Sequence, residues 1–249
     1  MRPSGIVCLV LLLGGSSVAI AQGADQPAYG RWQTFAAFFD YANDLSGIGT
    51  GAPGRKFTEL GFQYEHRLKA NRSVVWKYTG EFRPLIAESD PTSTFKTVYT
   101  SPPSYGTITG GPTAVLSCTP VSRSFMVTDP NSGMVFSGTT SIACGRRWTY
   151  VEGLSPLGTR FNFRPRSRWQ PTANVLTGLL LSAKKIPIDS AGSFNFTFEL
   201  GGGLEYFRTE SQSVRFEYQF QHFSNAYTAS SNPGVDSGLF KVTYTFGRR

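Results

Sequence analysis

Apolar and polar residues alternate along eight segments of the chain, with the two-residue period that is typical of β-strands. In the clearest segment Phe216, Tyr218 and Phe220 alternate with Glu217 and Gln219, so that the aromatic rings share one face. We expect strands over residues 31–42, 57–68, 73–83, 146–153, 173–185, 193–207, 213–227 and 237–247.

The polar faces of these segments carry ionisable and amide side chains, which suit a polar lumen while the wide aromatic face meets lipid. A soluble barrel or a secreted β-sandwich would instead turn the apolar face inward. We therefore predict an all-β, eight-stranded antiparallel transmembrane barrel of the outer-membrane type. The expected lumen residues are Glu59, Gln63, Glu65, Lys77, Glu81, Glu217 and Gln219.

Connection lengths orient the predicted barrel, since such barrels have short periplasmic turns and longer external loops. The connections at residues 70–72 and 209–212 are short, whereas the one expected at 154–171 is longer and fits poorly. Residues 84–145 form one long external loop, rich in Ser, Thr, Pro and Gly, which is either a lid or a decoration.

The first residues predict export. Arg2 precedes an apolar run over residues 6–13, and a small-x-small cleavage site follows at 19–21, so residues 1–21 form a signal peptide and residues 22–249 the barrel. Cleavage removes Cys8 and leaves Cys118 and Cys144, which we expect to form one disulfide in an oxidising compartment.

The composition agrees with a barrel in the outer membrane of a Gram-negative bacterium. Aromatic residues make up 14% of the chain and charged residues only 16%, against about 25% charged residues in soluble domains. The formal net charge of +8 becomes +7 once Arg2 is removed. Anionic partners are therefore expected, and outside the cytoplasm a phosphorylated glycolipid is a better partner than nucleic acid.

Three residues near the C-terminal end have the chemistry of a hydrolytic triad. His222 and Ser224 share the outward face of one strand, and Asp236 lies on the outward face of the next, across a hairpin. His222 can act as the base for Ser224, and Asp236 can orient the imidazole. Asn225 or Asn232 can supply an oxyanion donor. The alternative is that three ordinary polar residues lie at strand ends, at the level of the lipid headgroups.

Other motifs are less informative. His66 lies near the opposite end of the barrel, where interfacial histidines are common. The glycines at 201–203 lead into more strand rather than into a helix, so they indicate close packing or a bend instead of a phosphate-binding loop. The arginines at 164, 166 and 168, followed by Trp169, suggest an interfacial cluster on the periplasmic side.

Two stretches resemble the PagL-type lipid A 3-O-deacylases. They are the strand at 194–206, and the His-Phe-Ser-Asn-Ala at 222–226 followed by Asn-Pro-Gly at 232–234 and a final aromatic-rich strand. The resemblance covers roughly residues 170–249 and implies a metal-free, cofactor-free serine hydrolase on the outer wall of an eight-stranded barrel. It implies Ser224 as the nucleophile, His222 as the base and Asn232 as an oxyanion contributor.

The chain departs from the family pattern in three places. Asp236 stands where the family usually has Glu, the segment 84–145 is long for the family, and the chain continues past Phe246 with Gly-Arg-Arg. Despite these departures, the resemblance implies an esterase that removes the 3-hydroxyacyl chain at position 3 of lipid A, with its active site at the outer leaflet. The alternatives are a non-catalytic barrel with a structural or adhesive role, and an inactive relative that binds lipid A.

Overall fold

The computed structural model describes residues 27–44 and 54–246, which form ten β-strands in one antiparallel sheet and a short 3-10 helix, η1. The predicted signal peptide and residues 247–249 lie outside the described residues. The elements are β1 (Gln33–Asp44), β2 (Lys56–Ala70), β3 (Val74–Ser101), η1 (Pro103–Tyr105), β4 (Thr107–Ala114), β5 (Val121–Thr128), β6 (Val135–Phe163), β7 (Trp169–Ile186), β8 (Gly192–Phe207), β9 (Gln212–Ser224) and β10 (Val235–Phe246).

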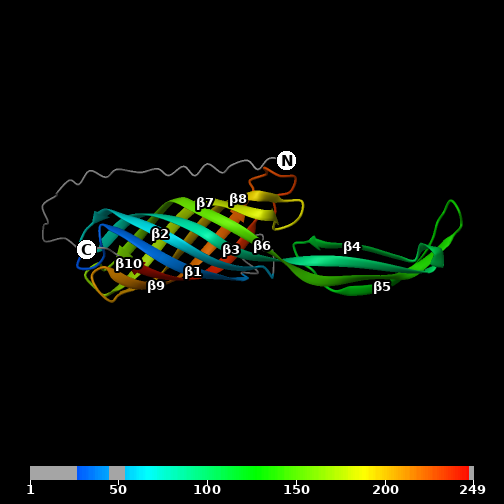
Figure 1. The fold of residues 1–249 in the computed structure, drawn as a ribbon, viewed down its shortest axis with the longest axis horizontal. Coiled ribbons are helices and arrows are strands. Elements are labelled where there is room, and N and C mark those ends of the chain that lie inside the picture. Colours follow the sequence, from blue (N-terminus) through cyan, green and yellow to red (C-terminus); the bar gives the residue numbers. More distant parts are fainter. Residues whose placement is uncertain (1–26, 45–53, 247–249) are drawn as a thin grey trace.

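Eight of these strands close into a barrel (Figure 1). Around the ring each strand pairs with its neighbours in the order β3, β2, β1, β10, β9, β8, β7, β6, and the pairing of β3 with β6 closes it. Closure leaves no open sheet edge in the wall, which a bilayer requires because lipid cannot hydrogen-bond to backbone groups. The predicted eight-stranded antiparallel membrane barrel is confirmed, with β4 and β5 as additional strands outside the ring.

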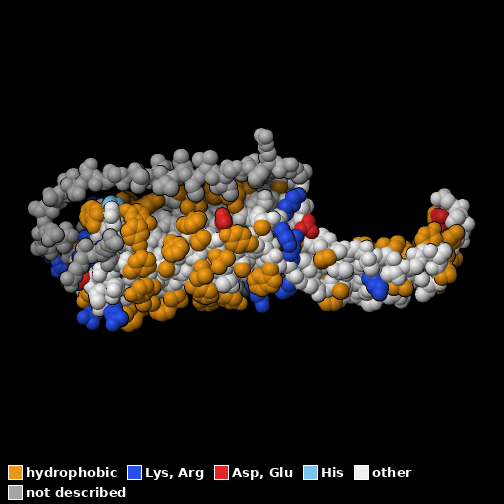
Figure 2. All heavy atoms as spheres, viewed as in Figure 1, with side chains coloured by type: hydrophobic (Ala, Val, Ile, Leu, Met, Phe, Trp, Pro, Cys, Tyr) orange, Lys and Arg blue, Asp and Glu red, His pale blue; other side chains and the backbone are white. Residues whose placement is uncertain are grey.

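The two-residue alternation separates the faces of the wall. Phe216 is 56% exposed and its neighbour Glu217 only 4%. Hydrophobic side chains cover much of the barrel surface in view, and Lys and Arg side chains gather at its two ends (Figure 2). The outward apolar residues include Phe35, Phe39, Leu60, Phe62, Phe82, Leu200, Leu204 and Phe240.

Charged side chains that form ion pairs fill much of the lumen. Arg215 lies 3.0 Å from Glu65 and 2.9 Å from Glu217, and Lys241 donates hydrogen bonds of 2.7 and 2.8 Å to Glu81. All seven residues that the sequence predicted for the lumen are buried, which confirms the inward direction of the polar faces. Further buried charges in this network are Asp40, Arg83, Arg160, Glu199 and Glu205.

An apolar cluster lies inside the barrel toward the end at which β9 finishes and β10 begins. The rings of Phe57 and Phe223 meet edge to face, with centroids 5.6 Å apart. Ile86, Leu180 and Leu239 complete the centre of this cluster, and all are buried. The lumen therefore changes from ionic to apolar along its length, and the alternating pattern alone did not predict this apolar part.

The segment 84–145 is not the long loop that the sequence predicted. β3 and β6 continue past the barrel wall and pair with each other as far as Ser101 and Ser137, while β4 and β5 add one strand on each side. We call this four-stranded sheet, formed by residues 90–147, the extension; it projects from one end of the barrel (Figure 1). Both of its faces are largely exposed, so its sequence lacks the apolar alternation that marks a half-buried strand.

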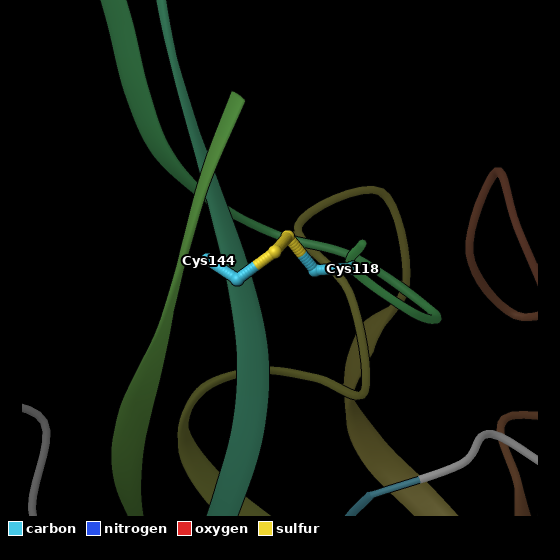
Figure 3. The surroundings of a disulfide bond; sticks show 2 residues. All are labelled: Cys118 and Cys144. Atoms are coloured by element: carbon cyan, nitrogen blue, oxygen red, sulfur yellow. A yellow bond between two sulfur atoms is a disulfide. The ribbon is translucent and has the colours of Figure 1, made fainter. Parts of the chain in front are cut away.

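A disulfide between Cys118 and Cys144 ties the segment between β4 and β5 to β6 near the base of the extension (Figure 3). The 26-residue separation of the two cysteines encloses β5 and its turn to β6. A crosslink of this kind stabilises mainly by restricting the unfolded chain. Farther out, Tyr99 packs against Tyr105 and Phe125.

Three short connections lie at the opposite end of the barrel from the extension. They cover residues 71–73, 164–168 and 208–211. The connection predicted at 154–171 was wrong, because β6 continues to Phe163 before the chain turns. This correction removes the one connection that fitted the barrel topology poorly. None of the helical segments in the described ranges is long and apolar enough to cross a membrane.

Replacing Arg215 by Met should destabilise the barrel, because Glu65 and Glu217 would lose a buried countercharge. Breaking a buried ion pair costs about 3–5 kcal/mol. We expect a lower midpoint of urea unfolding in detergent micelles, followed by the heat-dependent gel shift of the folded barrel. Arg123→Met, on an exposed strand of the extension, is the matched control and should leave the midpoint unchanged; equal midpoints for both variants would contradict the prediction.

Candidate active site

His222 and Asp236 face each other across the β9–β10 pair, where the ladder aligns them directly. His222 Nδ1 lies 2.7 Å from Asp236 Oδ1. The imidazole side chain is 38% exposed, whereas the carboxylate is 4% exposed. A carboxylate that accepts from Nδ1–H fixes the tautomer in which Nε2 carries the free lone pair. This contact therefore prepares His222 to act as a base at Nε2.

Ser224 is the last residue of β9 and shares the outward face of the strand with His222. It pairs with Phe196 of β8, and His222 pairs with Phe198, so two half-exposed aromatic rings flank the polar residues. Within the part of the chain that the structure describes, no hydrogen bond joins the Ser224 hydroxyl to His222. Nucleophile–base contacts are often long in ligand-free enzymes and shorten when substrate binds.

The β9–β10 loop is held together by Asn225 and Asn232. The backbone N–H of Asn225 donates to Asn232 Oδ1 at 2.9 Å, and Asn225 Nδ2 donates to the Ser231 carbonyl at 2.7 Å. Because an N–H group donates to the Asn232 side-chain oxygen, the amide NH₂ of Asn232 is left for another acceptor. The Asn225 side chain already forms hydrogen bonds within the loop. Of the two asparagines predicted as oxyanion donors, only Asn232 therefore keeps its amide NH₂ for another acceptor.

Ala226 and Tyr227 adopt left-handed backbone conformations, with φ of 49° and 62°. Consecutive non-glycine residues in this region are uncommon and need support from their surroundings. Here Asn225 Oδ1 accepts from the Tyr227 N–H at 3.0 Å, and the Asn225 carbonyl accepts from the Thr228 N–H at 3.0 Å. The loop that carries Asn232 is therefore fixed by its own hydrogen bonds, directly after Ser224.

A second loop, residues 187–191 between β7 and β8, links the β9–β10 loop to the extension. Ser230 donates to the Ser190 carbonyl at 2.9 Å. Asp189 accepts from the backbone N–H of Ala114 at 3.1 Å and pairs with Arg147 at the base of the extension. Partial burial opposes ionisation of Asp189, but the hydrogen bonds from Arg147 and Ala114 lower the pKa of its carboxyl below the usual value. Sequence reasoning missed this link, since only the barrel brings these segments together.

A shallow apolar hollow of about 320 Å³ lies on the outer wall beside the site. Leu157, Thr177, Leu179 and Phe196 line it, and Phe196 is the ladder partner of Ser224. The hollow coincides with a register shift in the β6–β7 pairing between Leu154 and Leu157. The hollow therefore reaches as far as β8, the strand next to the one that carries Ser224.

The remaining sequence motifs lie away from this site. His66 pairs with Gln33 near the short-turn end, where its ring meets Trp32 at 5.7 Å between centroids. The glycines at 201–203 lie inside β8, and a Cβ at Gly203 would stand 1.9 Å from the Phe216 carbonyl oxygen, which confirms close packing. Over the described ranges, no group of three or more His, Cys, Asp or Glu side chains is arranged to hold a metal ion.

The residues that form the candidate site lie within a segment that matches a known family model. The family model described as "Lipid A 3-O-deacylase (PagL)" matches residues 129–245. Over these residues, just under half of the chain, the sequence is similar to the PagL family. The matched segment contains His222, Ser224 and Asp236, and begins just before β6. The resemblance to PagL-type deacylases is thereby confirmed.

Two further comparisons complete this result. No curated protein matches the chain. Among solved structures the chain is similar to neisserial surface protein A (NspA), with 8% sequence identity and a TM-score of 0.41. That alignment covers 86% of this chain and 94% of the NspA chain. A likeness at this level carries no information about chemistry.

Replacing Asn232 by Ala should loosen the β9–β10 loop, because the Asn225 N–H would lose its acceptor. A hydrogen bond contributes about 1 kcal/mol, so the open population should rise about fivefold. Tyr227 is 83% exposed, and chymotrypsin cleavage after it reports the opening. Thr209→Ala, in the turn at the opposite end, should leave that cleavage rate unchanged; an unchanged rate in Asn232→Ala would show that the side chain does not hold the loop.

Proposed function

We propose that the chain is an outer-membrane serine esterase that removes the ester-linked 3-hydroxyacyl chain at position 3 of lipid A. The observation that carries this proposal is the 2.7 Å contact between His222 and Asp236, beside Ser224 on the lipid-facing wall. Polar residues on such a wall are unfavourable unless they have a role. The match of residues 129–245 to the lipid A 3-O-deacylase family supports the substrate class.

In the proposed reaction, Ser224 Oγ attacks the ester carbonyl carbon while its proton passes to His222 Nε2. Asp236 holds the ring and stabilises the imidazolium. The amide NH₂ of Asn232 is the proposed donor to the oxyanion. Collapse of the tetrahedral intermediate breaks the ester C–O bond, and His222 returns the proton to the sugar 3-oxygen. Water, deprotonated by His222, then hydrolyses the acyl-enzyme and releases the 3-hydroxy fatty acid.

His222 and Ser224 lie on the lipid-facing wall, a position that suits a substrate embedded in the membrane. A lipid approaching sideways would place its acyl chain over Phe196 and the apolar hollow without leaving the bilayer. We assign the end with the extension to the cell exterior, because short turns at 71–73, 164–168 and 208–211 are typical of the periplasmic side. The site would then lie at the outer leaflet, where lipid A is found.

The shorter acid is compatible with this mechanism. Asp236 is the direct ladder partner of His222, and directly opposed residues have Cβ atoms about 4.5–5.5 Å apart. Although the Asp236 side chain is one methylene shorter than that of Glu, its carboxylate therefore still reaches His222 Nδ1, at 2.7 Å. The register of β9 against β10 compensates for the departure from the usual family residue.

The second proposed function is a non-catalytic barrel with a structural or adhesive role. The observation that favours it is the extension, whose four strands and disulfide build a rigid surface well beyond the wall. Exposed apolar residues on this surface include Met126 and Val127. The two functions differ in one outcome, the mass of lipid A in cells that express the protein.

Ser224→Ala and His222→Ala should each abolish the loss of one 3-hydroxyacyl chain from lipid A, because the nucleophile or its base is gone. The measurement is mass spectrometry of lipid A from a Gram-negative host that expresses the full chain. His66→Ala and Ser124→Ala are matched controls away from the site and should retain activity. An unchanged lipid A mass with folded, heat-modifiable wild-type protein would overturn the esterase proposal.

Asp236→Asn should lower the deacylation rate by about 10⁴-fold, the size of effect seen when a triad carboxylate becomes an amide and the imidazole tautomer is lost. Asp236→Glu, which restores the usual family acid, should keep measurable activity. Deacylation rates are compared in detergent micelles at equal amounts of folded protein. A rate for Asp236→Asn within tenfold of the wild type would exclude Asp236 as the orienting residue.

A further inference from the structure

Four cationic side chains lie at the rim of the barrel from which the extension emerges. These rim cations are Lys56 on β2, Arg146 on β6, and Lys184 and Lys185 on β7, and all four are exposed. Lys and Arg side chains gather at this junction in the space-filling view (Figure 2). They do not appear in the proposed reaction, and a basic surplus on an exported protein calls for an anionic partner.

The rim cations are neighbours around the barrel. Lys56 pairs with Ser89 of β3 in the ladder, and Arg146 Nε donates to Ser89 Oγ at 2.7 Å. The next residue, Arg147, donates to the Lys185 carbonyl at 2.7 Å. The band therefore runs continuously over β2, β3, β6 and β7.

Two acids near this rim are already paired with other cations. Asp90 accepts from Arg55 at 3.0 Å, and Asp189 pairs with Arg147. Glu152, farther along the outward face of β6, accepts a hydrogen bond of 2.7 Å from Tyr150. Among the side chains that the structure describes, those of residues 27–42 and 54–246, no carboxylate forms an ion pair with a rim cation. Lys185 is near enough to Asp189 to interact with it electrostatically, and the band as a whole keeps a surplus of positive charge.

Arg146 is held in place for an external ligand. Its Nη2 donates to the carbonyls of Gly54, at 2.5 Å, and Ser89, at 2.8 Å, in addition to the bond from Nε. Its Nη1 has no hydrogen-bond acceptor in the described part of the protein. A guanidinium fixed by neutral acceptors keeps its full charge, and its planar donors suit phosphate oxygens better than a mobile ammonium does.

The position of the band relative to Ser224 restricts the ligand. Ser224 pairs with Phe196, and Phe196 pairs with Leu179 of β7, so Leu179 marks the level of the nucleophile on that strand. Lys184 follows five residues later, about 15 Å along the strand. Below the band the wall is apolar, so a ligand that occupies both regions has acyl chains under an anionic headgroup.

We propose that the rim cations bind the phosphate groups of lipid A and thereby hold its sugar headgroup above Ser224. This inference rests on the proposed deacylase function for the identity of the lipid, but phosphate binding itself needs no catalysis. Arg146 supplies the fixed donor, and Lys184 and Lys185 supply mobile charges on the side of the band closer to β8 and β9. The band gives the apolar wall a second point of attachment, which orients the disaccharide.

The test measures lipid binding to the full chain with Ser224→Ala, so that no turnover occurs during the titration. Lipid A with both phosphates and the same lipid A after enzymatic dephosphorylation are titrated into the purified protein in neutral detergent micelles. The variant Arg146→Gln/Lys184→Gln/Lys185→Gln should bind the phosphorylated lipid about tenfold more weakly, since charge-assisted hydrogen bonds are about twice as strong as neutral ones. It should bind the dephosphorylated lipid as the parent does.

The matched control removes three positive charges elsewhere, through Lys69→Gln/Arg208→Gln at the short-turn end and Lys96→Gln on the extension. It should bind both lipids as the parent does. The proposal is overturned if the rim variant binds phosphorylated lipid A normally, if it loses both lipids equally, or if the control loses as much affinity. The proposal is also overturned if inorganic phosphate displaces bound lipid A as effectively as free lipid A does, because the site would then bind free anions.

Failure of this proposal can be separated from failure of the proposed function. If wild-type protein leaves lipid A intact in cells but the rim variant still shows phosphate-dependent loss of binding, the esterase is wrong and the phosphate site stands. If the wild type deacylates lipid A and the rim variant binds both lipids normally, the esterase stands and the phosphate site is wrong.

Discussion

Closure of the sheet by the pairing of β3 with β6 is the constraint on which the rest of the structure depends. In hydrocarbon every backbone N–H and C=O needs a partner within the protein, and a ring of strands provides one for each. A closed ring has only two faces, so each side chain along a strand points either to the lipid or into the lumen. The aromatic wall, the charged interior and the outward position of His222 and Ser224 all follow from that choice.

The lumen shows how an eight-stranded barrel accommodates its inward face. Its interior has room for little more than side chains, and here Arg83, Arg160 and Arg215 fill it together with the carboxylates around them. Isolated buried charges would be very unfavourable, whereas paired ones compensate each other. The apolar cluster around Phe57 and Phe223 fills the lumen near the candidate site, and it packs beneath the β9–β10 corner from inside.

The same end of the barrel combines three features that are separate in the sequence. The β9–β10 loop carries Asn232, the 187–191 loop carries Asp189, and the base of the extension carries Arg147. Hydrogen bonds from Ser230 to Ser190 and between Asp189 and Arg147 join them into one rigid rim. For the proposed esterase such fixed support would hold His222, Ser224 and Asn232 in place while a lipid approaches from the side.

The sequence by itself determined the barrel, its polar lumen and the shared outward face of His222, Ser224 and Asp236, because strand parity follows from a local two-residue period. It missed the extension and misplaced the turn after β6, since Ser- and Thr-rich strands exposed on both faces show no alternation. Only the tertiary structure decided that Asp236 reaches His222, that Asn225 is committed within its loop, and that the rim cations are neighbours. These are matters of register and closure, which depend on pairing between distant strands rather than on any local pattern.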